Sequence, residues 1–351
     1  MYYINPNIKN LYRTSYKESR ESFLRLDMNE NPEGLPSDFL KKVLNEITPE
    51  YLAMYPETNT LVDRLSKMLN FNTDNICLTN GSDDAMRLSF EVFGQSGKKL
   101  VSVSPSFEMY SVYANMYGMK HCKVFYDENF EVKVEDMLGL IDEDTSIVVI
   151  LNPNSPIGRN WTENEVRMII EKARDNKAIV IIDEAYHYFY PKSFINICKE
   201  YDNVIIFRTF SKLFSIAGCR IGYIVSNNNI INMIKNASST YSVNCFAIKI
   251  AENLLKYPEI TKDLINVERQ GREYLLSKLK INGYEFYNNG ANYILIKSKK
   301  PPMELFKELK RRNILIKTYS NPILEKWIRI TTGSIDTMEK FWNEFKKVDL
   351  L

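Results

Sequence analysis

The chain has 351 residues, of which 44% are hydrophobic and 26% are charged, an ordinary balance for a soluble globular protein with a sizeable core. Its 46 basic and 44 acidic residues leave a formal net charge of +2, which argues against an extended basic face and against nucleic acid as a partner. Residues 1–13 lack an apolar signal core, and the longest apolar runs are only of strand length, so no membrane segment is expected.

The cysteines and histidines indicate the redox compartment of the protein and whether it has a metal site. Five cysteines lie far apart, without CxxC spacing, at Cys77, Cys122, Cys198, Cys219 and Cys245. This pattern predicts reduced thiols and a cytoplasmic location. The only histidines are His121 and His187, so a histidine-rich metal site is not expected.

Short apolar runs alternate with amphipathic stretches through the middle of the chain. The runs predict buried strands at 75–79, 99–103, 146–151, 178–183 and 203–208, and the stretches predict helices that include 82–93 and 162–176. Strands separated by helices favour a mostly parallel sheet that is covered on both faces. The fold class indicated is therefore α/β.

After Tyr223 the pattern changes to long helices followed by shorter strands. Helices are predicted at 244–256, 258–280 and 335–348, and strands at 284–287, 292–297, 314–317 and 327–331. We therefore expect a large α/β domain over residues 36–244 and a smaller α+β domain over 245–351. The amino-terminal arm, residues 1–35, is expected to pack with the small domain.

Lys212 lies among small and hydroxylic residues, with Arg220 eight positions further along the chain. A lysine that forms an imine with an aldehyde, beside a phosphate held by hydroxyls and an arginine, needs such a setting. The segment resembles the Schiff-base lysine motif of pyridoxal phosphate (PLP) dependent aminotransferases of class I and II. The resemblance is strongest to the histidinol-phosphate aminotransferase group. It implies the PLP-dependent transferase type I fold, with Thr209, Ser211 and Arg220 holding the phosphate.

Asp183 ends a strongly apolar predicted strand, where a carboxylate is costly unless it is paired. A protonated pyridine nitrogen is such a partner, and Tyr186 is then expected to hydrogen-bond the phenolate oxygen of the cofactor. The alternative is an acidic strand end that binds magnesium beside a nucleotide. That alternative needs a G-x-x-x-x-G-K-[ST] loop, and the run from Gly94 to Lys98 has the wrong spacing.

Two further segments follow predicted strands. Gly81, Ser82 and Asp83 open a helix whose free amides attract a phosphate, although a glycine turn with a helix cap is common in any α/β protein. The segment 104–110 resembles the family's segment whose aromatic residue stacks on the pyridine ring, which implicates Phe107. The alternative for Phe107 is an ordinary core position.

The segment 151–158 resembles the family's Asn-Pro-Asn-Asn-Pro-Thr-Gly loop, with two departures. Ser155 occupies the position of the asparagine that supports the phenolate oxygen, and Ile157 replaces threonine. The shorter serine leaves Asn154 or a water as the alternative contact to the cofactor.

Other resemblances concern the substrate and the partner subunit. Asn29 matches the family's Asn-Glu-Asn-Pro motif near the substrate carboxylate, and Arg329 matches the arginine that binds this carboxylate. Lys317 occupies a position where relatives carry an arginine near the substrate phosphate, and Tyr16 aligns with an arm tyrosine that covers the substrate. Tyr55 matches a residue that reaches the partner's PLP phosphate, which implies a homodimer with a shared active site.

The reaction implied is transfer of an amino group from an amino acid such as glutamate to a small keto substrate. The substituted motifs favour a divergent member with a phosphorylated acceptor such as dihydroxyacetone phosphate. The alternative reaction is decarboxylation of threonine phosphate or serine phosphate on the same scaffold. A non-catalytic metabolite-binding relative is the remaining alternative, and intact Lys212 and Asp183 argue against it.

Overall fold

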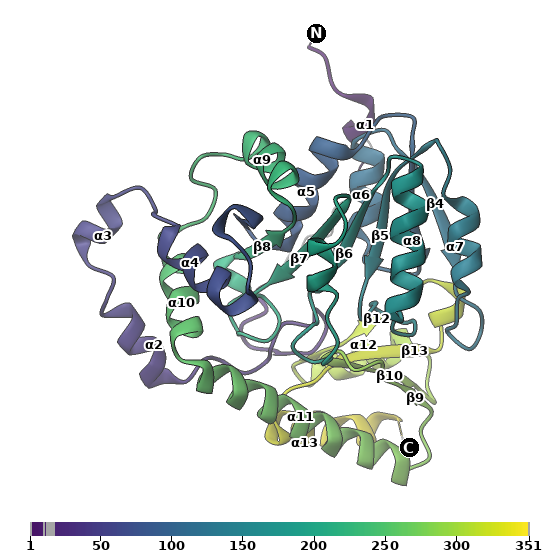
Figure 1. Ribbon diagram of the computed structural model, residues 1–351. Helices are drawn as coiled ribbons and strands as arrows, with labels where there is room; N and C mark the ends of the chain where they lie inside the picture. Colours follow the sequence, from purple (N-terminus) through teal and green to yellow (C-terminus); the bar gives the residue numbers. More distant parts are fainter. Residues whose placement is uncertain (1, 10, 12–17, 350–351) are drawn as a thin grey trace.

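The computed structural model describes residues 2–9, 11 and 18–349. Its central sheet has seven strands in the order β2-β8-β7-β6-β5-β3-β4 (Figure 1). Only β8 runs antiparallel to its neighbours, and the other adjacent pairs are parallel. The strands are β2 (Ile76–Thr79), β3 (Lys99–Ser104), β4 (Lys120–Phe125), β5 (Thr145–Leu151), β6 (Ile179–Asp183), β7 (Val204–Thr209) and β8 (Gly222–Val225). The predicted α/β class with a mostly parallel sheet is confirmed.

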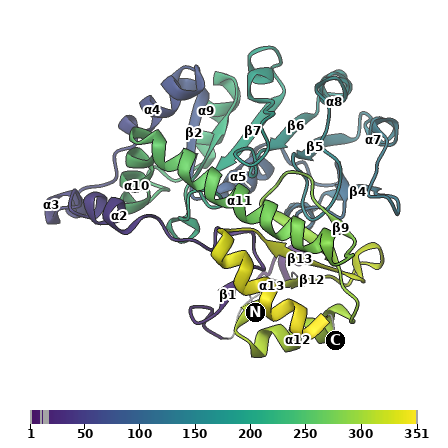
Figure 2. The same cartoon turned by 90° about the horizontal axis from the view of Figure 1, so that it is seen from below.

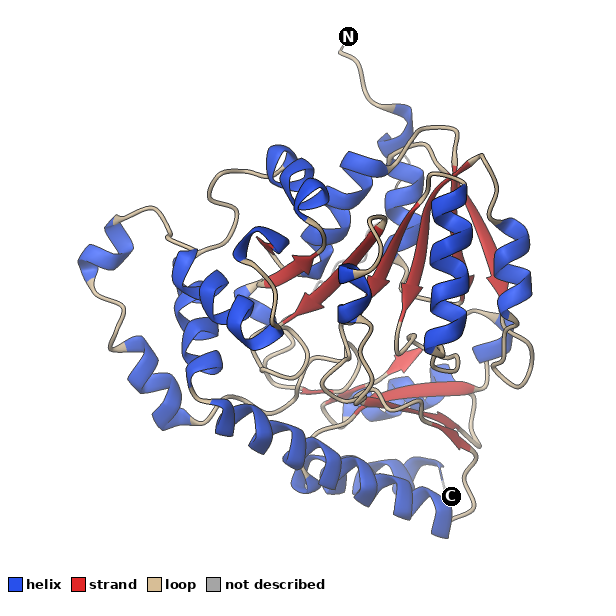
Figure 3. Cartoon of the chain, in the orientation of Figure 1, coloured by secondary structure: helices blue, strands red, loops and turns tan. Residues whose placement is uncertain are grey.

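Helices cover both faces of this sheet, which is why its central strands are nearly continuous apolar runs. α8 lies across one face, and α5 and α6 lie across the other (Figures 1 and 3). The helices of this part are α5 (Ser82–Phe93), α6 (Met109–Met116), α7 (Val134–Leu140), α8 (Glu163–Asp175), α9 (Asn228–Ala237) and α10 (Cys245–Lys256). Short 3₁₀ turns are η1 (Thr73–Asn75), η2 (Ile195–Lys199) and η3 (Ala217–Cys219).

α8 illustrates how local sequence sets an element. Thr162 and Glu165 form a reciprocal capping box that starts the helix. Val166, Ile169 and Ile170 then recur at helical spacing and are buried. Because the same pattern is visible in the sequence, the predicted helix agrees with the observed one.

A second, antiparallel sheet has the order β12-β13-β10-β9. Its strands are β9 (Phe286–Tyr287), β10 (Tyr293–Lys297), β12 (Lys317–Thr318) and β13 (Trp327–Thr331). It packs with α11 (Pro258–Ile281), α12 (Pro302–Arg311) and α13 (Ile335–Asp349), which lie together in Figure 2. The turn η4 (Pro322–Leu324) precedes β13. These elements share a hydrophobic cluster that is separate from the core of the central sheet.

The amino-terminal segment contacts both parts of the molecule and contributes to a third, two-stranded sheet. β1 (Leu24–Arg25) pairs in parallel with β11 (Ile314–Leu315), and Leu26 lies in the second cluster. α1 (Pro6–Lys9) instead lies against α6. The helices α2 (Ser37–Leu44), α3 (Pro49–Ala53) and α4 (Asn59–Leu69) follow, with α3 standing out at the left of Figure 1. The predicted domain boundaries stay a prediction.

No helix within residues 2–9, 11 and 18–349 is both long enough and apolar enough to span a bilayer.

Candidate functional site

The site is centred on Asp183 and Lys212, which adjacent parallel strands bring to one edge of the central sheet. Asp183 is the last residue of β6, and Lys212 follows the end of β7 by three residues. Carboxyl ends of parallel strands meet at the same edge, where α/β proteins bind ligands. The Lys212 Nζ donates a hydrogen bond to the Met28 carbonyl oxygen at 2.9 Å and lies 5.9 Å from the Tyr186 ring centre.

The Asp183 carboxylate is buried and accepts two hydrogen bonds. The Tyr110 hydroxyl and the Ala185 backbone N–H each donate to it at 3.0 Å. Burial raises the pKa of Asp183 to about 6, against the opposing effects of these hydrogen bonds and of the Lys212 charge. Among the described residues no cation forms an ion pair with it. A buried carboxylate in this state is suited to a cationic N–H from a ligand.

Tyr110 is a site residue that sequence reasoning did not find. It lies in the segment 104–110, yet the hydrogen bond to Asp183 joins residues 73 positions apart. Desolvation raises the pKa of the Tyr110 hydroxyl well above its usual value, so this group stays protonated and donates. A tyrosine after a predicted strand was the only available signal.

Gly81 and Arg220 lie close together. Gly81 has a φ of +81°, and a Cβ at this position would lie 2.6 Å from Arg220 Nη2. Arg220 Nη1 is 3.4 Å from the Ser211 hydroxyl oxygen, and Thr209 accepts a hydrogen bond from the Ser211 backbone N–H at 3.1 Å. The predicted phosphate-binding residues on both sides of Lys212 therefore lie together.

The start of α5 adds backbone donors to this arrangement. Ser82 and Asp83 are its first residues, and N–H groups in the first turn of a helix have no intrahelical acceptor. Such groups bind anions. The role available to Asp83 is therefore that of its backbone N–H, because its carboxylate has the same charge as an anion.

Asn29 was predicted to lie near the substrate and Tyr186 to contact the cofactor, and the two side chains are in direct contact. The Asn29 side-chain N–H donates to the Tyr186 hydroxyl at 2.9 Å, and the Asn29 backbone N–H donates to Thr331 Oγ1 at 2.9 Å. Thr331 was not identified from the sequence, because its partner lies 302 positions away. The Asn31 side chain also donates to the Leu213 carbonyl at 2.9 Å, which holds this segment against the Lys212 loop.

The Asn154 side chain forms hydrogen bonds within its own loop, and its contact to the cofactor stays a prediction. Its amide donates to the carbonyl oxygens of Pro105 and Ile157, and its Oδ1 accepts from Ser106 at 2.6 Å. Both N–H groups are therefore used inside the loop. Asn154 is fully buried and supports the loop that carries Ser155.

Ser155 contacts Arg329, and its contact to the cofactor stays a prediction. Its hydroxyl accepts a hydrogen bond from Arg329 Nη1 at 3.2 Å, and Arg329 Nη2 donates to the Asp27 carbonyl at 2.7 Å. The guanidinium also lies 5.5 Å from the centre of the Tyr293 ring. Arg329 is thus fixed at the border between the two sheets.

Lys317 lies directly opposite Arg329 in the antiparallel pair of β12 and β13. Directly paired residues project from the same face of a sheet. Lys317 is exposed, whereas Arg329 is buried. The two cations that were predicted to contact substrate are therefore on one face, at different depths.

The remaining predicted residues are more peripheral. Phe107 is 44% exposed and meets Tyr110 edge to face, with 5.8 Å between ring centres. Tyr55 is 74% exposed and stacks on Tyr241 at 4.4 Å. Tyr16 lies outside the described residues.

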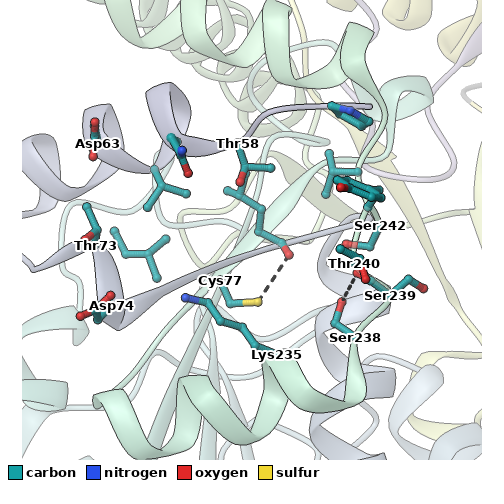
Figure 4. A pocket seen from close by; sticks show the side chains of 17 residues that line it. Thr58, Asp63, Thr73, Asp74, Cys77, Lys235, Ser238, Ser239, Thr240 and Ser242 are labelled. Carbon is teal, nitrogen blue, oxygen red and sulfur yellow. Dashed lines mark hydrogen bonds between the residues drawn. The ribbon is translucent and has the colours of Figure 1, made fainter. Parts of the chain in front are cut away.

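A cavity of about 720 Å³ lies elsewhere, beside β2. Figure 4 shows Lys235 and Cys77 on one side of it and the loop with Ser239, Thr240 and Ser242 near them. None of the predicted site residues lines this cavity. Charged and polar side chains with complementary roles cluster around Lys212, and we assign the candidate site to that region.

Comparisons with known proteins agree with this assignment. Residues 21–345 match the family model described as aminotransferase class I and II. A histidinol-phosphate aminotransferase from Caldanaerobacter subterraneus subsp. tengcongensis is 33% identical over 329 residues, which is 92% of each chain. The crystal structure of the histidinol-phosphate aminotransferase from Clostridium acetobutylicum has a TM-score of 0.83 and 27% identity, covering 93% of this chain and 98% of that one.

A third relative has a different reaction in its name. The structure of the L-threonine-O-3-phosphate decarboxylase from Porphyromonas gingivalis has a TM-score of 0.77 and 26% identity, covering 92% of this chain and 98% of that one. The fold is thus shared by more than one enzyme. On the family match over most of its length, the chain belongs to the class I and II aminotransferases, which are PLP-dependent enzymes.

Proposed function

We propose that this aminotransferase moves an amino group from an amino acid such as glutamate to a small phosphorylated keto substrate, with dihydroxyacetone phosphate as one candidate. The observation that carries the proposal is the buried Asp183 carboxylate, which forms no ion pair with a described residue but lies within electrostatic reach of Lys212. The names of the relatives support a phosphorylated substrate, because histidinol phosphate carries a phosphate group.

The site residues fit PLP at both of its ends. Asp183 would pair with the ring nitrogen, and Tyr186 would donate to the phenolate oxygen. Gly81, the first amides of α5 and Arg220, with the hydroxyls of Thr209 and Ser211, would hold the phosphate. Phe107 would lie against the ring. When bound, PLP supplies an aldehyde carbon and an electron-withdrawing ring.

Lys212 has two tasks in this proposal. Its amine would attach the cofactor in the resting enzyme and, once an amino donor has freed it, would accept and return the proton that moves during amino transfer. Asp183 would hold the proton of the ring nitrogen, so that the bound ring can stabilise negative charge.

The described residues proposed to bind the substrate lie where the second sheet packs against the central sheet. Arg329 would bind the substrate carboxylate, with Asn29 beside it. Lys317 would contact the phosphate of the acceptor, since it projects from the same face as Arg329 but lies at the exposed edge. Tyr16 is proposed to cover the substrate.

Replacing Gly81 with alanine is expected to weaken PLP binding roughly 10- to 100-fold, since the new Cβ would displace Arg220 from the phosphate and cost a charge-assisted hydrogen bond. Titration of the cofactor-free protein with PLP, followed by visible absorption, measures the effect. Gly97→Ala is the matched control. Gly97 has a similar φ of +84°, but a Cβ there meets nothing within 4 Å. Equal losses of affinity in both variants would refute the assignment of Gly81.

We further propose a homodimer in which Tyr55 completes the partner's phosphate site. Large apolar side chains are exposed at the end of α3 and just after it, and also just before α10 and in its first turn, namely Leu52, Met54, Tyr55, Tyr241 and Phe246. The stacked pair of Tyr55 and Tyr241 joins the two segments into one patch. Exposed patches of this kind favour association between protein chains.

Mixing inactive Tyr55→Ala and Lys212→Ala subunits is expected to restore about a quarter of wild-type activity, because half of the dimers are hybrids with one complete site each. Subunit exchange is verified by mass spectrometry of the intact dimers, and the rate of 2-oxoglutarate formation reports activity. Each variant alone serves as its control. Hybrid dimers without activity would contradict the shared site.

The proposed function is tested by titrating the PLP-loaded protein with L-glutamate. Bleaching of the visible absorption with stoichiometric release of 2-oxoglutarate is expected, and keto phosphates are then screened for restoring the absorption. The decarboxylase is the second candidate, favoured by the relative from Porphyromonas gingivalis. An unchanged spectrum with glutamate, together with CO₂ release from threonine phosphate or serine phosphate, would establish it. Binding without either reaction would indicate a non-catalytic protein.

The cytoplasmic location stays a prediction, which the five unpaired cysteines support.

A further inference from the structure

The two faces of the second sheet pack against different parts of the molecule. Side chains alternate between the faces along a strand. One set belongs to the cluster with α11, α12 and α13, namely Ile294, Ile296, Ile328 and Ile330. The alternate set belongs to the core of the central sheet, namely Tyr293, Leu295 and Trp327. Arg329, paired with Leu295, is on this second face, which is the face of the candidate site.

Tyr319 belongs to the same face. Lys317 pairs with Arg329 in β12, and Tyr319 lies two residues further on, directly after the strand ends at Thr318. The Tyr319 ring packs against the core of the central sheet rather than against the second cluster. Its side chain therefore enters the region between the sheets where Arg329 lies.

Two hydrogen-bond donors on this face are buried and unused. The Tyr319 hydroxyl and the Arg329 Nε have no hydrogen-bond partner among the described residues. The other guanidinium nitrogens of Arg329 are satisfied by Ser155 and by the Asp27 carbonyl. Buried donors without acceptors destabilise a protein, and a pair of them on one face calls for an acceptor supplied by a ligand.

The charge state of Tyr319 suits a donor. Burial raises its pKa to about 12, while the Arg329 charge lowers it and Tyr186 raises it. The hydroxyl is therefore protonated at neutral pH. These influences also indicate that Tyr319 is within electrostatic reach of both Arg329 and Tyr186.

We propose that the Tyr319 hydroxyl donates a hydrogen bond to the substrate oxyanion that Arg329 binds, and so helps to select acidic substrates. The inference rests on the proposed function and adds a residue to its substrate side. The oxyanion belongs to a carboxylate or to a phosphate, since both present oxygen acceptors of the same kind. In either case the ligand would satisfy a donor that has no partner among the residues described by the structure.

Tyr319→Phe is the direct test, because it removes the hydroxyl and keeps the ring. The PLP-loaded wild-type and variant proteins are titrated by calorimetry with 2-oxoglutarate, which carries carboxylates only, and with glycerol 3-phosphate, which carries a phosphate only. Neither compound has an amino group to transfer to the PLP form, so the titration measures binding without turnover. We expect affinity for one of the two compounds to fall roughly 10-fold in the variant.

The melting temperature of the unliganded protein provides a second measurement. It should stay unchanged or rise in the variant, whereas the affinity for ligand should fall. Because the hydroxyl is buried and unpaired, Tyr319→Phe should leave the melting temperature unchanged or raise it. Ligand-induced stabilisation should decrease at the same time. Tyr284→Phe is the matched control, since Tyr284 is a buried tyrosine in the second cluster, and its affinities should equal those of wild type.

The outcomes separate this inference from the proposed function. Wild-type affinities for both compounds in Tyr319→Phe would overturn the role of Tyr319, even if glutamate bleaches the wild-type protein. A lower melting temperature of the unliganded variant with unchanged affinities would assign a structural role and also overturn it. Absence of any reaction of the wild type with glutamate would instead overturn the proposed amino donor. Weaker binding in Tyr319→Phe alone would support the inference.

Discussion

Replacing Lys212 with alanine is expected to lower the rate of amino transfer from glutamate by roughly 10²- to 10⁴-fold or more, the range attributed to a positioned proton-transfer group. The amine near Asp183 and Tyr186 is the group to which we assign both cofactor attachment and proton transfer. Single-turnover bleaching of the PLP-loaded variant with L-glutamate measures this loss.

Lys192→Ala is the matched control, because Lys192 is an exposed lysine in a loop after β6. Its rate should equal that of wild type. The folded state of Lys212→Ala is verified by its melting temperature, since the Nζ makes one hydrogen bond to the part of the chain that the structure describes. A Lys212→Ala enzyme that turns over at the wild-type rate would exclude Lys212 as the proton-transfer group.

Replacing Asp183 with asparagine is expected to have opposite effects on catalysis and on stability. Loss of a buried partner of the cationic ring costs several kcal/mol, which corresponds to roughly 10²- to 10³-fold in rate. The cofactor-free protein should instead gain roughly 1–3 kcal/mol of unfolding free energy at pH 7, since burying the ionised carboxylate is unfavourable. Single-turnover kinetics and urea unfolding measure the two quantities.

The stability gain should depend on pH in a defined direction. The pKa of Asp183 is about 6 in the folded protein and lies above its usual value, so the native state binds the proton more tightly than the unfolded state. The contribution of Asp183 to wild-type stability should therefore become less unfavourable as the pH falls from 7 to 4. The advantage of Asp183→Asn over wild type should vanish over the same interval.

Asp202→Asn is the control for this behaviour, because Asp202 is exposed just before β7. Its unfolding free energy should follow that of wild type across the whole pH range. An advantage of Asp183→Asn that persists at pH 4 would show that the carboxylate is not the group responsible.

Much of the fold could be predicted from local sequence patterns, because the buried strands are runs of consecutive apolar residues. β5 and β6 are buried on both faces and therefore read as apolar runs. β4 was missed because it is an edge strand with exposed residues such as Lys120 and Phe125. The antiparallel direction of β8 was not predicted either, since direction depends on the connection and not on the apolar pattern.

The candidate site was predictable where a residue type implies its own chemistry, as for Asp183 at the end of a buried strand. Residues that act by supporting another residue were not predictable in this way. Tyr110 bonds Asp183, and Thr331 bonds Asn29, across long separations in sequence. The hydrogen bonds of the Asn154 amide within its own loop were not predictable either, because a resemblance of the loop gives no side-chain partners.

Identification of the lysine that attaches PLP tests the central claim most directly. The PLP-loaded wild-type protein is reduced with borohydride, digested, and analysed by peptide mass spectrometry. We predict that the reduced cofactor adduct is found on Lys212, within the peptide between Arg208 and Arg220. An adduct on another lysine, or no adduct after saturation with PLP, would contradict the assignment of the site.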